Sequence, residues 1–228
     1  MFASPGWAGY IVRADGEAFT EVGGTWVEPR VVCNRPESFV AFWVGIGGAE
    51  RDSRALEQIG TSAECGENAV LSHSAWYQLF PEPPVDVPLA IRPGDIVSAK
   101  LTVLGKAVEL ALRNTSTGAS FSTKVTASTL ETGSAEWIAE APAACLSPGC
   151  VSLPLAGFAS VVFSHATATA GLLHGAIVDA AWTAQPVEMA PRGPTVPMVP
   201  TRVWRKGSAF AVRSFSGNRR PDVWWIRE

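Results

Sequence analysis

The 228-residue chain has little charge, few histidines and no long apolar run. Charged residues make up only 17% of it, the net charge is −3, and no basic cluster precedes Arg202, which argues against a nucleic-acid partner. No stretch approaches the roughly 20 apolar residues that a membrane span needs. We therefore expect neither nucleic acid nor membrane as a partner. No signal peptide is visible after Met1, so either the protein stays inside the cell or a leader has been removed.

Several common catalytic motifs are also missing. The three histidines, His73, His165 and His174, form no His-Glu-x-x-His pair, and no Gly-x-Ser-x-Gly turn surrounds them. The glycines from Gly45 to Gly48 follow an apolar run but open no helix, unlike a phosphate-binding loop. These absences disfavour a zinc peptidase of that type, a serine hydrolase of that type and a nucleotide-binding enzyme. We expect no cofactor.

Four cysteines leave their own pairing open. Cys145 and Cys150 bracket Leu-Ser-Pro-Gly, whose turn-forming residues bring their ends together, and we predict a disulfide there. Four reduced, buried thiols and a zinc site are the alternatives. Zinc would need a second closely spaced pair, which Cys33 and Cys65 do not form. A 145–150 bridge favours an oxidising compartment, so we expect a secreted or otherwise extracytoplasmic protein.

The patterns that the sequence does contain mostly predict β-strands. Short runs rich in β-branched and aromatic residues recur, each closed by Gly, Pro, Asn or Asp, which predicts an all-β antiparallel sandwich or barrel. The stretches 166–175 and 179–184 are weak helix candidates because of their Thr and Gly content. The predicted strands cover residues 9–13, 25–32, 38–46, 75–80, 96–104, 108–114, 120–126, 135–139, 159–164 and 209–215.

One domain with a tail is the predicted organisation. Residues 1–216 form the domain, and residues 217–228 form a C-terminal extension that Trp224 and Trp225 would anchor. Residues 191–200 hold four prolines and are expected to be an extended connector rather than a strand. A monomer is the default expectation.

The chain is rich in tryptophan, with nine residues of this type. Several lie in the predicted strands, where a period of two sends some of them out from a sheet face. Each taken singly is explained equally well by the core. Taken together, Trp7, Trp43 and Trp76 would line a groove suited to an extended peptide or sugar chain.

Two polar residues interrupt apolar runs. Gln58 lies in Leu-Glu-Gln-Ile-Gly and Glu136 in Ser-Ala-Glu-Trp-Ile-Ala-Glu. An unpaired buried amide or carboxylate costs several kcal/mol, so a chain that keeps both has a use for them. An amide beside a carboxyl can carry out acid–base hydrolysis without histidine, serine or metal. The alternatives are a solvent-facing strand position for Glu136 and a loop amide for Gln58.

Strand alternation places Glu136, Ile138 and Glu140 on one face. The two carboxyls would then be about 13 Å apart, too far for a glycosidase pair within one strand. The partner of Glu136 must come from a neighbouring strand, and Gln58 is the leading candidate.

Eight segments form a recognisable series in order along the chain. They are Gly-Trp-Ala-Gly at 6–9, Phe-Trp-Val-Gly-Ile-Gly-Gly at 42–48, Leu-Glu-Gln-Ile-Gly at 56–60, Ala-Trp-Tyr-Gln-Leu-Phe-Pro-Glu at 75–82, Pro-Gly-Asp at 93–95, Leu-Arg-Asn-Thr-Ser-Thr-Gly at 112–118, Ala-Glu-Trp-Ile-Ala-Glu at 135–140 and Phe-Ala-Ser at 158–160. In this series the chain resembles the eqolisins, the family of glutamic peptidases, over most of residues 6–215.

The resemblance implies a β-sandwich of two large, bent sheets with a lectin-like, concanavalin-type jelly-roll topology. It implies an acid-acting endopeptidase of unfolded polypeptides, insensitive to pepstatin, with Gln58 and Glu136 as the catalytic pair. Substrate-binding positions would be Trp7, Trp43, Trp76, Gln78 and Glu140.

The chain departs from the fungal eqolisin pattern at four positions. Gly47 and Ser74 stand where acidic residues are expected, and Gln78 and Phe80 replace a glutamate and a tyrosine. Two other functions remain open. A carbohydrate- or peptide-binding module would use the same aromatic face, and a glycoside hydrolase would need a second carboxyl roughly 5–10 Å from Glu136.

Overall fold

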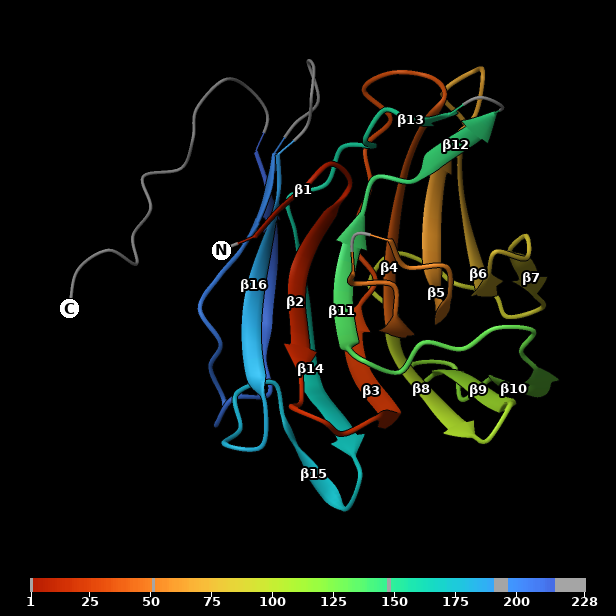
Figure 1. The fold of residues 1–228 in the computed structure, drawn as a ribbon. Coiled ribbons are helices and arrows are strands. Elements are labelled where there is room, and N and C mark those ends of the chain that lie inside the picture. Colours follow the sequence, from red (N-terminus) through yellow and green to blue (C-terminus); the bar gives the residue numbers. More distant parts are fainter. Residues whose placement is uncertain (1, 51, 147–148, 191–196, 216–228) are drawn as a thin grey trace.

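The computed structural model of the chain describes residues 2–50, 52–146, 149–190 and 197–215 (Figure 1). Within these residues the secondary structure is all β, with eighteen strands and no helix. Nearly all neighbouring strands pair antiparallel, and one continuous order joins fourteen of them. The fold prediction of an all-β antiparallel sandwich is confirmed. In the part of the chain that the structure describes, no helix has the length and apolar character to cross a membrane.

The continuous order folds into two layers, so that β2, β11 and β4 lie in front of β14 and β3 in Figure 1. The first layer runs β16 (Thr183–Met189), β2 (Trp7–Arg13), β11 (Ala135–Glu140), β4 (Ser38–Gly47), β5 (Leu56–Cys65), β6 (Leu71–Phe80) and β7 (Val85–Val87). The second runs β10 (Ser120–Thr126), β9 (Ala107–Asn114), β8 (Ile96–Leu104), β3 (Phe19–Val27), β14 (Ser160–Ala170), β18 (Phe210–Ser214) and β17 (Met198–Pro200). Pairing of β17 with β16 joins the layers at one edge.

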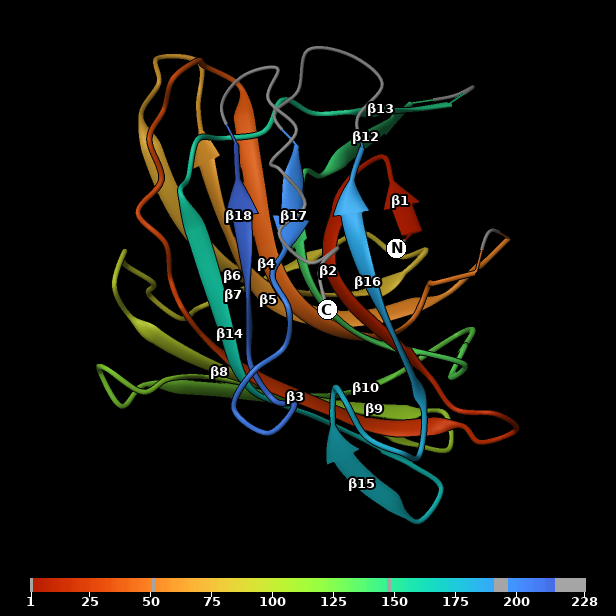
Figure 2. The ribbon, with the colours of Figure 1, turned by 90° about the vertical axis from the view of Figure 1, so that its left-hand side faces the viewer.

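Four strands lie outside this order. β1 (Phe2–Ser4) pairs parallel with β16, and β15 (Leu173–Ala176) pairs with β14. β12 (Ala143–Leu146) and β13 (Gly149–Ser152) form a separate two-stranded hairpin after β11. The view in Figure 2 shows how strongly β4 and β5 bend along their length.

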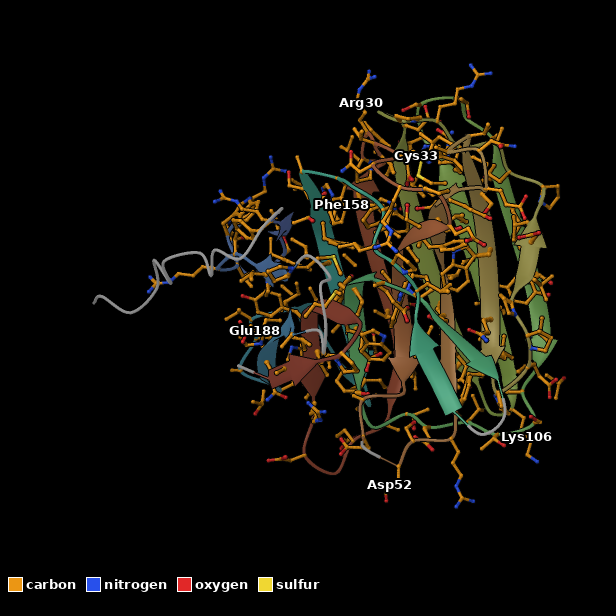
Figure 3. The ribbon with its side chains drawn as sticks, turned by 90° about the horizontal axis from the view of Figure 1, so that it is seen from above. Arg30, Cys33, Asp52, Lys106, Phe158 and Glu188 are labelled. Carbon is orange, nitrogen blue, oxygen red and sulfur yellow. A yellow bond between two sulfur atoms is a disulfide. The ribbon has the colours of Figure 1, made fainter. Side chains whose placement is uncertain are left out.

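The core lies between the two layers. Period-two alternation sends Phe42 and Val44 of β4 inward, where they meet Trp26 and Phe163 of the second layer, all of them buried. The side chains of both sheets fill this space in Figure 3. Burying large aromatic side chains is worth about 2–3 kcal/mol each, so this interface dominates the stability of the fold.

The outer face of the first layer carries a second apolar cluster. It contains Trp43, Trp76 and Ile138, with Trp7 and Ala49 packed at its margin. Trp43 and Ile138 are fully buried although they point away from the main core. Since both faces of β4 and β11 are buried, the sequences of both strands are mostly apolar, with little alternation between apolar and polar residues.

Several predicted boundaries hold and others do not. β8 and β10 have the predicted limits. The helix candidate at 166–175 is wrong, because this stretch completes β14 and forms β15, and the candidate at 179–184 leads into β16. The prediction of a connector without strand is wrong at Met198–Pro200, which is β17.

Residues 191–196 and the predicted extension at 217–228, with Trp224 and Trp225, lie outside the described residues, and the boundary at 216 stays a prediction.

Cys33 and Cys65 form a disulfide, with their Cα atoms 5.5 Å apart (Figure 3). The alternative of four reduced thiols is therefore wrong for this pair, which joins the segment before β4 to the end of β5. Cys145 and Cys150 are Cα partners across the β12–β13 hairpin. Their side chains lie outside the described part of the structure, so the bridge between them stays a prediction.

Candidate active site

Glu136 and Gln58 lie on either side of one glycine. Gly45 of β4 is the register partner of Glu136 on β11 and of Gln58 on β5. Register partners point to the same face, so the carboxyl and the amide extend from the outer face with no side chain between them. The expectation that they occupy adjacent strands is wrong. One strand separates them, which places their Cα atoms about 10 Å apart.

Both side chains are buried. Glu136 is 0% exposed and Gln58 is 5% exposed, which rules out a solvent-facing strand position and a loop amide. Both carboxyl oxygens of Glu136 and Oε1 of Gln58 are buried with no hydrogen-bond partner among the described residues. Unpaired buried polar atoms are costly, so their presence in two side chains on one face of the sheet makes Glu136 and Gln58 the candidate catalytic pair.

Burial raises the pKa of the Glu136 carboxyl well above its ordinary value of 4.5. The neighbouring Ser134 side chain and the positive charge of Arg13 oppose this rise, whereas the carboxyl of Glu57 adds to it. Desolvation is the largest cause, because an ionised carboxylate loses its hydration in this position.

Gln58 is held by a chain of amides. Its Nε2 donates to Oε1 of Gln78 on β6 at 2.7 Å, and Nε2 of Gln78 donates to the carbonyl oxygen of Glu82 at 2.8 Å. Gln78 is also the register partner of Gln58. The structure therefore places Gln78, predicted as a substrate-binding residue, in direct contact with the predicted catalytic amide.

The three predicted tryptophans gather on the same face as the pair. The rings of Trp7 and Trp43 meet edge to face, with centroids 5.0 Å apart, and Trp76 belongs to the same apolar cluster. Trp43 and Trp76 flank Gly60 in one row of the sheet, adjacent to the row that holds Glu136 and Gln58. These aromatic walls border the pair on one side.

Glu140 supports this wall. Nε1 of Trp43 donates to Oε2 of Glu140 at 2.8 Å. Burial raises the pKa of Glu140, and hydrogen bonds from Trp43 and Trp7 oppose that rise. The hydrogen-bond partner of the Gln58 amide is Gln78, whereas Glu140 orients Trp43.

Sequence reasoning missed Arg13, at the end of β2. Its guanidinium donates to Oε1 of Glu50, to Oε1 of Gln185 and to the carbonyl oxygen of Ala49. The only sequence signal was a charged residue closing an otherwise apolar strand. Arg13 brings a positive charge to the site that the predicted residues lack.

Sequence reasoning also missed Glu57, which is fully buried on the opposite face of β5. Its register partners are Ile46 and Leu79, so it points into the main core, and its carboxyl oxygens have no partner among the described residues. Burial raises the pKa of Glu57 from 4.5 to about 8, and Glu131 contributes to the rise.

The position across Gly45 from Glu136 therefore holds an amide rather than a second carboxylate, which counts against a glycoside hydrolase. Glu57 does not supply the missing group, because it extends from the other face of the sheet. Among the described residues, no three His, Cys, Asp or Glu side chains are close enough together to hold a metal ion.

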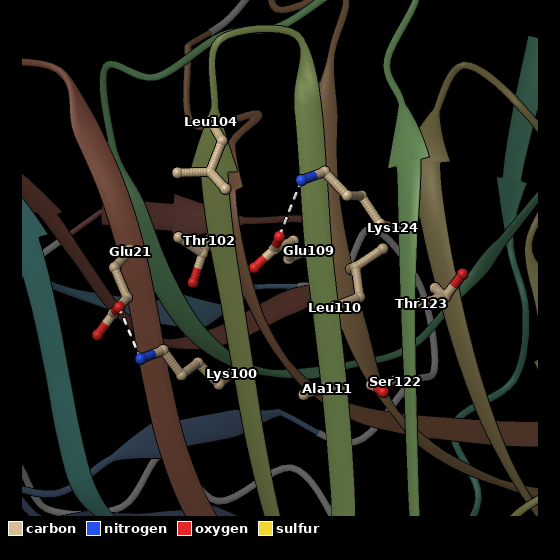
Figure 4. A pocket seen from close by; sticks show the side chains of 10 residues that line it. All are labelled: Glu21, Lys100, Thr102, Leu104, Glu109, Leu110, Ala111, Ser122, Thr123 and Lys124. Carbon is tan, nitrogen blue, oxygen red and sulfur yellow. Dashed lines mark hydrogen bonds and ion pairs between the residues drawn. The ribbon is translucent and has the colours of Figure 1, made fainter.

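A cavity of about 620 Å³ lies elsewhere, on the outer face of the second layer (Figure 4). Lys100 pairs with Glu21 at 2.7 Å across it, and Lys124 pairs with Glu109 at 3.0 Å. Both lysines that line this cavity are thus paired with a carboxylate, and such surface pairs contribute little to stability. The volume of this cavity gives no reason to move the candidate site away from Glu136 and Gln58.

Comparisons with known proteins show which family and which solved structures the chain is similar to. The model of the Peptidase A4 family matches residues 5–193. Scytalido-glutamic peptidase, solved with a peptide-based transition state analog, superposes with a TM-score of 0.78 at 23% identity, over 93% of this chain and 99% of that one. SCP-B, an eqolisin solved with the tripeptide Ala-Ile-His, gives 0.74 at 21% identity, over 93% and 99%. Aspergilloglutamic peptidase from Aspergillus niger gives 0.61 at 25% identity, over 78% and 100%. No match is found among curated protein sequences.

Proposed function

We propose that this chain, which belongs to the Peptidase A4 family of peptide-bond hydrolases, the eqolisins, is an acid-acting endopeptidase that uses Glu136 and Gln58. The supporting observation is the position of these two side chains on either side of Gly45, buried and with unpaired polar atoms. A carboxyl and an amide arranged in this way are able to hold one water molecule between their tips.

In the proposed mechanism Glu136 acts first as a general base. Its carboxylate takes a proton from the water, and the water oxygen attacks the carbonyl carbon of the scissile peptide bond. Gln58 donates an amide N–H to the oxygen on which negative charge develops, and one preorganised donor of this kind is worth about 3–4 kcal/mol. The protonated Glu136 then gives its proton to the departing amine, so no covalent intermediate forms.

The electrostatics of the site suit both halves of this cycle. The raised pKa of Glu136 makes its protonated form readily available for protonating the leaving amine. The same shift sets the acid limit of the reaction, because the base must first be ionised. We therefore expect the best rates at mildly acid pH rather than at strongly acid pH.

The proposed substrate is an unfolded polypeptide. Trp7, Trp43 and Trp76 provide apolar walls that would contact an extended chain on either side of the cleaved bond. The solved relatives with peptide-type ligands support this assignment. Gly47, Ser74 and Gln78 carry no charge, so we expect apolar and uncharged side chains to be accepted beside the pair.

We further propose that the protein acts in a secreted or otherwise extracytoplasmic setting. The Cys33–Cys65 disulfide supports this, because such bonds persist in oxidising compartments.

Digestion of a denatured protein across the acid to neutral range tests the proposed function. Wild type should cleave internal peptide bonds in the presence of pepstatin, and Glu136→Gln should remain folded but lose the activity. Arg113→Gln, an exposed substitution on β9, is a control for handling and purity. Cleavage that survives in Glu136→Gln would show that another group is the base.

A further inference from the structure

Arg13 is anchored at three points. Its Nε donates to Oε1 of Glu50 at 2.9 Å, its Nη1 to Oε1 of Gln185 at 2.9 Å and its Nη2 to the carbonyl oxygen of Ala49 at 3.2 Å. A planar guanidinium bound at all three nitrogens has little freedom to rotate. The Arg13 side chain is 32% exposed, so its charge is only partly hydrated.

The groups that bind Arg13 lie on opposite sides of β11, the strand that carries Glu136. Gln185 belongs to β16, on one side of β2, and Ala49 and Glu50 follow β4 on the other side of β11. The strand order is β16, β2, β11, β4, so the contacts of the guanidinium extend across the beginning of β11. Ala49 packs on the outer apolar cluster, which shows that this loop folds back over the outer face.

Register places Arg13 close to Glu136. Ile11 is the partner of Glu136 on β2, and Arg13 lies two residues further along the same face. A diagonal neighbour of this kind lies within reach of a long side chain. Gln185 is in turn the partner of Ile11, so the amide that holds Arg13 belongs to the same row as the catalytic pair.

The other charged groups around Glu136 differ from Arg13 in sign or position. Its own strand carries Glu140, about 13 Å away on the same face. The neighbouring strand β4 has the uncharged Gly45 opposite Glu136, and the carboxyl of Glu57 on β5 extends from the opposite face. The segment before β11 carries Glu131, which is bound to Ser53 and to the Arg54 amide. The ionisation of Glu136 is opposed by desolvation and by Glu57, and it is favoured by the neighbouring Ser134 side chain and by the positive charge of Arg13.

We propose that Arg13 is a positioning residue for peptide hydrolysis: fixed between β16 and the loop after β4, it provides the positive charge that favours the carboxylate form of Glu136. This inference rests on the proposed function, in which the carboxylate is the base. It assigns to Arg13 the task of widening, toward lower pH, the range in which this buried base is ionised, because desolvation alone would confine that range to higher pH.

The pH dependence of kcat/KM on one peptide substrate tests this role. In Arg13→Gln the acid limb should move to higher pH by about one unit, the lower end of the effect of a nearby opposite charge. Glu50→Gln breaks the same clamp but removes a negative charge, so its acid limb should stay in place or move to lower pH. Lys100→Gln removes a positive charge from the distant second layer and should leave the limb unmoved.

The opposite signs distinguish an electrostatic role from a structural one. If Arg13 only holds the loop, Arg13→Gln and Glu50→Gln damage the same clamp and should move the acid limb of kcat/KM in the same direction. That result would overturn the proposal. An unmoved acid limb in Arg13→Gln would overturn it too. If Arg13→Gln does not fold, Arg13→Lys retains the charge and should keep the wild-type acid limb while losing part of kcat. An acid limb shifted upward in Arg13→Lys would contradict the proposal.

A second readout separates this inference from the proposed function. Titration of the Glu136 carboxyl by infrared difference spectroscopy, with Glu136→Gln to assign the band, reports its ionisation without any substrate. Arg13→Gln should shift this titration upward even if the protein cleaved no peptide. Absence of Glu136-dependent cleavage in wild type would overturn the proposed function alone, and an unshifted titration would overturn the role of Arg13 alone.

Discussion

Gln58 donates from Nε2 to Oε1 of Gln78 at 2.7 Å, and this contact determines the orientation of the Gln58 amide. Nε2 of Gln78 is bound to the carbonyl oxygen of Glu82, which can only accept, so Oε1 of Gln78 must point toward Gln58. Because this oxygen can only accept, the amide nitrogen of Gln58, and not its oxygen, must face Gln78. One of its two N–H groups is taken by Gln78, and in the proposed mechanism the other donates to the oxyanion.

Gln78→Leu should therefore lower kcat about ten-fold with a smaller change in KM. The substitution removes a hydrogen bond worth ~1 kcal/mol and frees the Gln58 amide to turn. Gln78→Glu is the matched control, since its carboxyl still accepts from Gln58 and should retain most of kcat. Steady-state kinetics on one peptide give the result, and equal losses in both variants would contradict a role through orientation.

Gly45→Ala should inactivate the protein more than it destabilises it. A Cβ at this position would lie 2.9 Å from the ring of Trp43, 3.0 Å from the carbonyl oxygen of Glu57 and 3.1 Å from Leu56. The displaced Trp43 would disturb the geometry between the pair, and a 1 Å misplacement costs on the order of 100-fold in rate. Gly133→Ala, with open space around its Cβ, is the control and should keep full kcat/KM. Wild-type rates in Gly45→Ala would contradict this view.

Glu57 should make the fold less stable as pH rises. Its carboxyl has a pKa of about 8 in the folded protein and an ordinary pKa of 4.5. Between these values the folded state binds more protons than the unfolded state, so the free energy of unfolding falls with increasing pH; below 4.5 the contribution is fully present. Across this pH window the free energy of unfolding of Glu57→Gln should rise relative to that of wild type by more than ~1.4 kcal/mol, the equivalent of one pKa unit.

Urea denaturation of wild type and Glu57→Gln at several pH values measures this difference. Glu64→Gln, an exposed position on the same strand, controls for the substitution itself. A stability difference between wild type and Glu57→Gln that stays constant with pH would show that Glu57 titrates normally in the folded protein.

The Cys33–Cys65 bridge should contribute about 3–4 kcal/mol to the free energy of unfolding, because it closes a loop with a sequence separation of 32. The double variant Cys33→Ala/Cys65→Ala should show this loss in urea denaturation. Cys145→Ser/Cys150→Ser tests the predicted second bridge separately. An unchanged midpoint in the first variant would mean that the bridge does not form in solution.

The fold could be predicted in outline from local patterns. The limits of β8 and β10 followed from clean alternation between flanking turns. β16 was not predicted because Pro186 and its polar neighbours weaken the strand signal. β16 tolerates them as a strand whose partners are β2 and the short strands β1 and β17. The pairing of Cys33 with Cys65 depends on strand order, which no local pattern contains.

The site was predictable in its residues but not in its geometry. Gln58 and Glu136 stand out because each interrupts an apolar run, yet their separation by β4 is a long-range property of the sheet. Glu57 carried the same signal as Gln58. When both faces of a strand are buried, adjacent polar residues are both buried, and alternation then assigns them to opposite faces. Arg13 became visible only through its contacts with Ala49, Glu50 and Gln185.

A double-mutant cycle of Glu136→Gln and Gln58→Ala on one peptide substrate tests the pairing most directly. Each single variant should lower kcat by about 100-fold or more, and the double variant should be hardly worse than the poorer single one, because both residues act on the same water. Losses that multiply in the double variant, or near wild-type kcat in Gln58→Ala, would contradict a shared catalytic role.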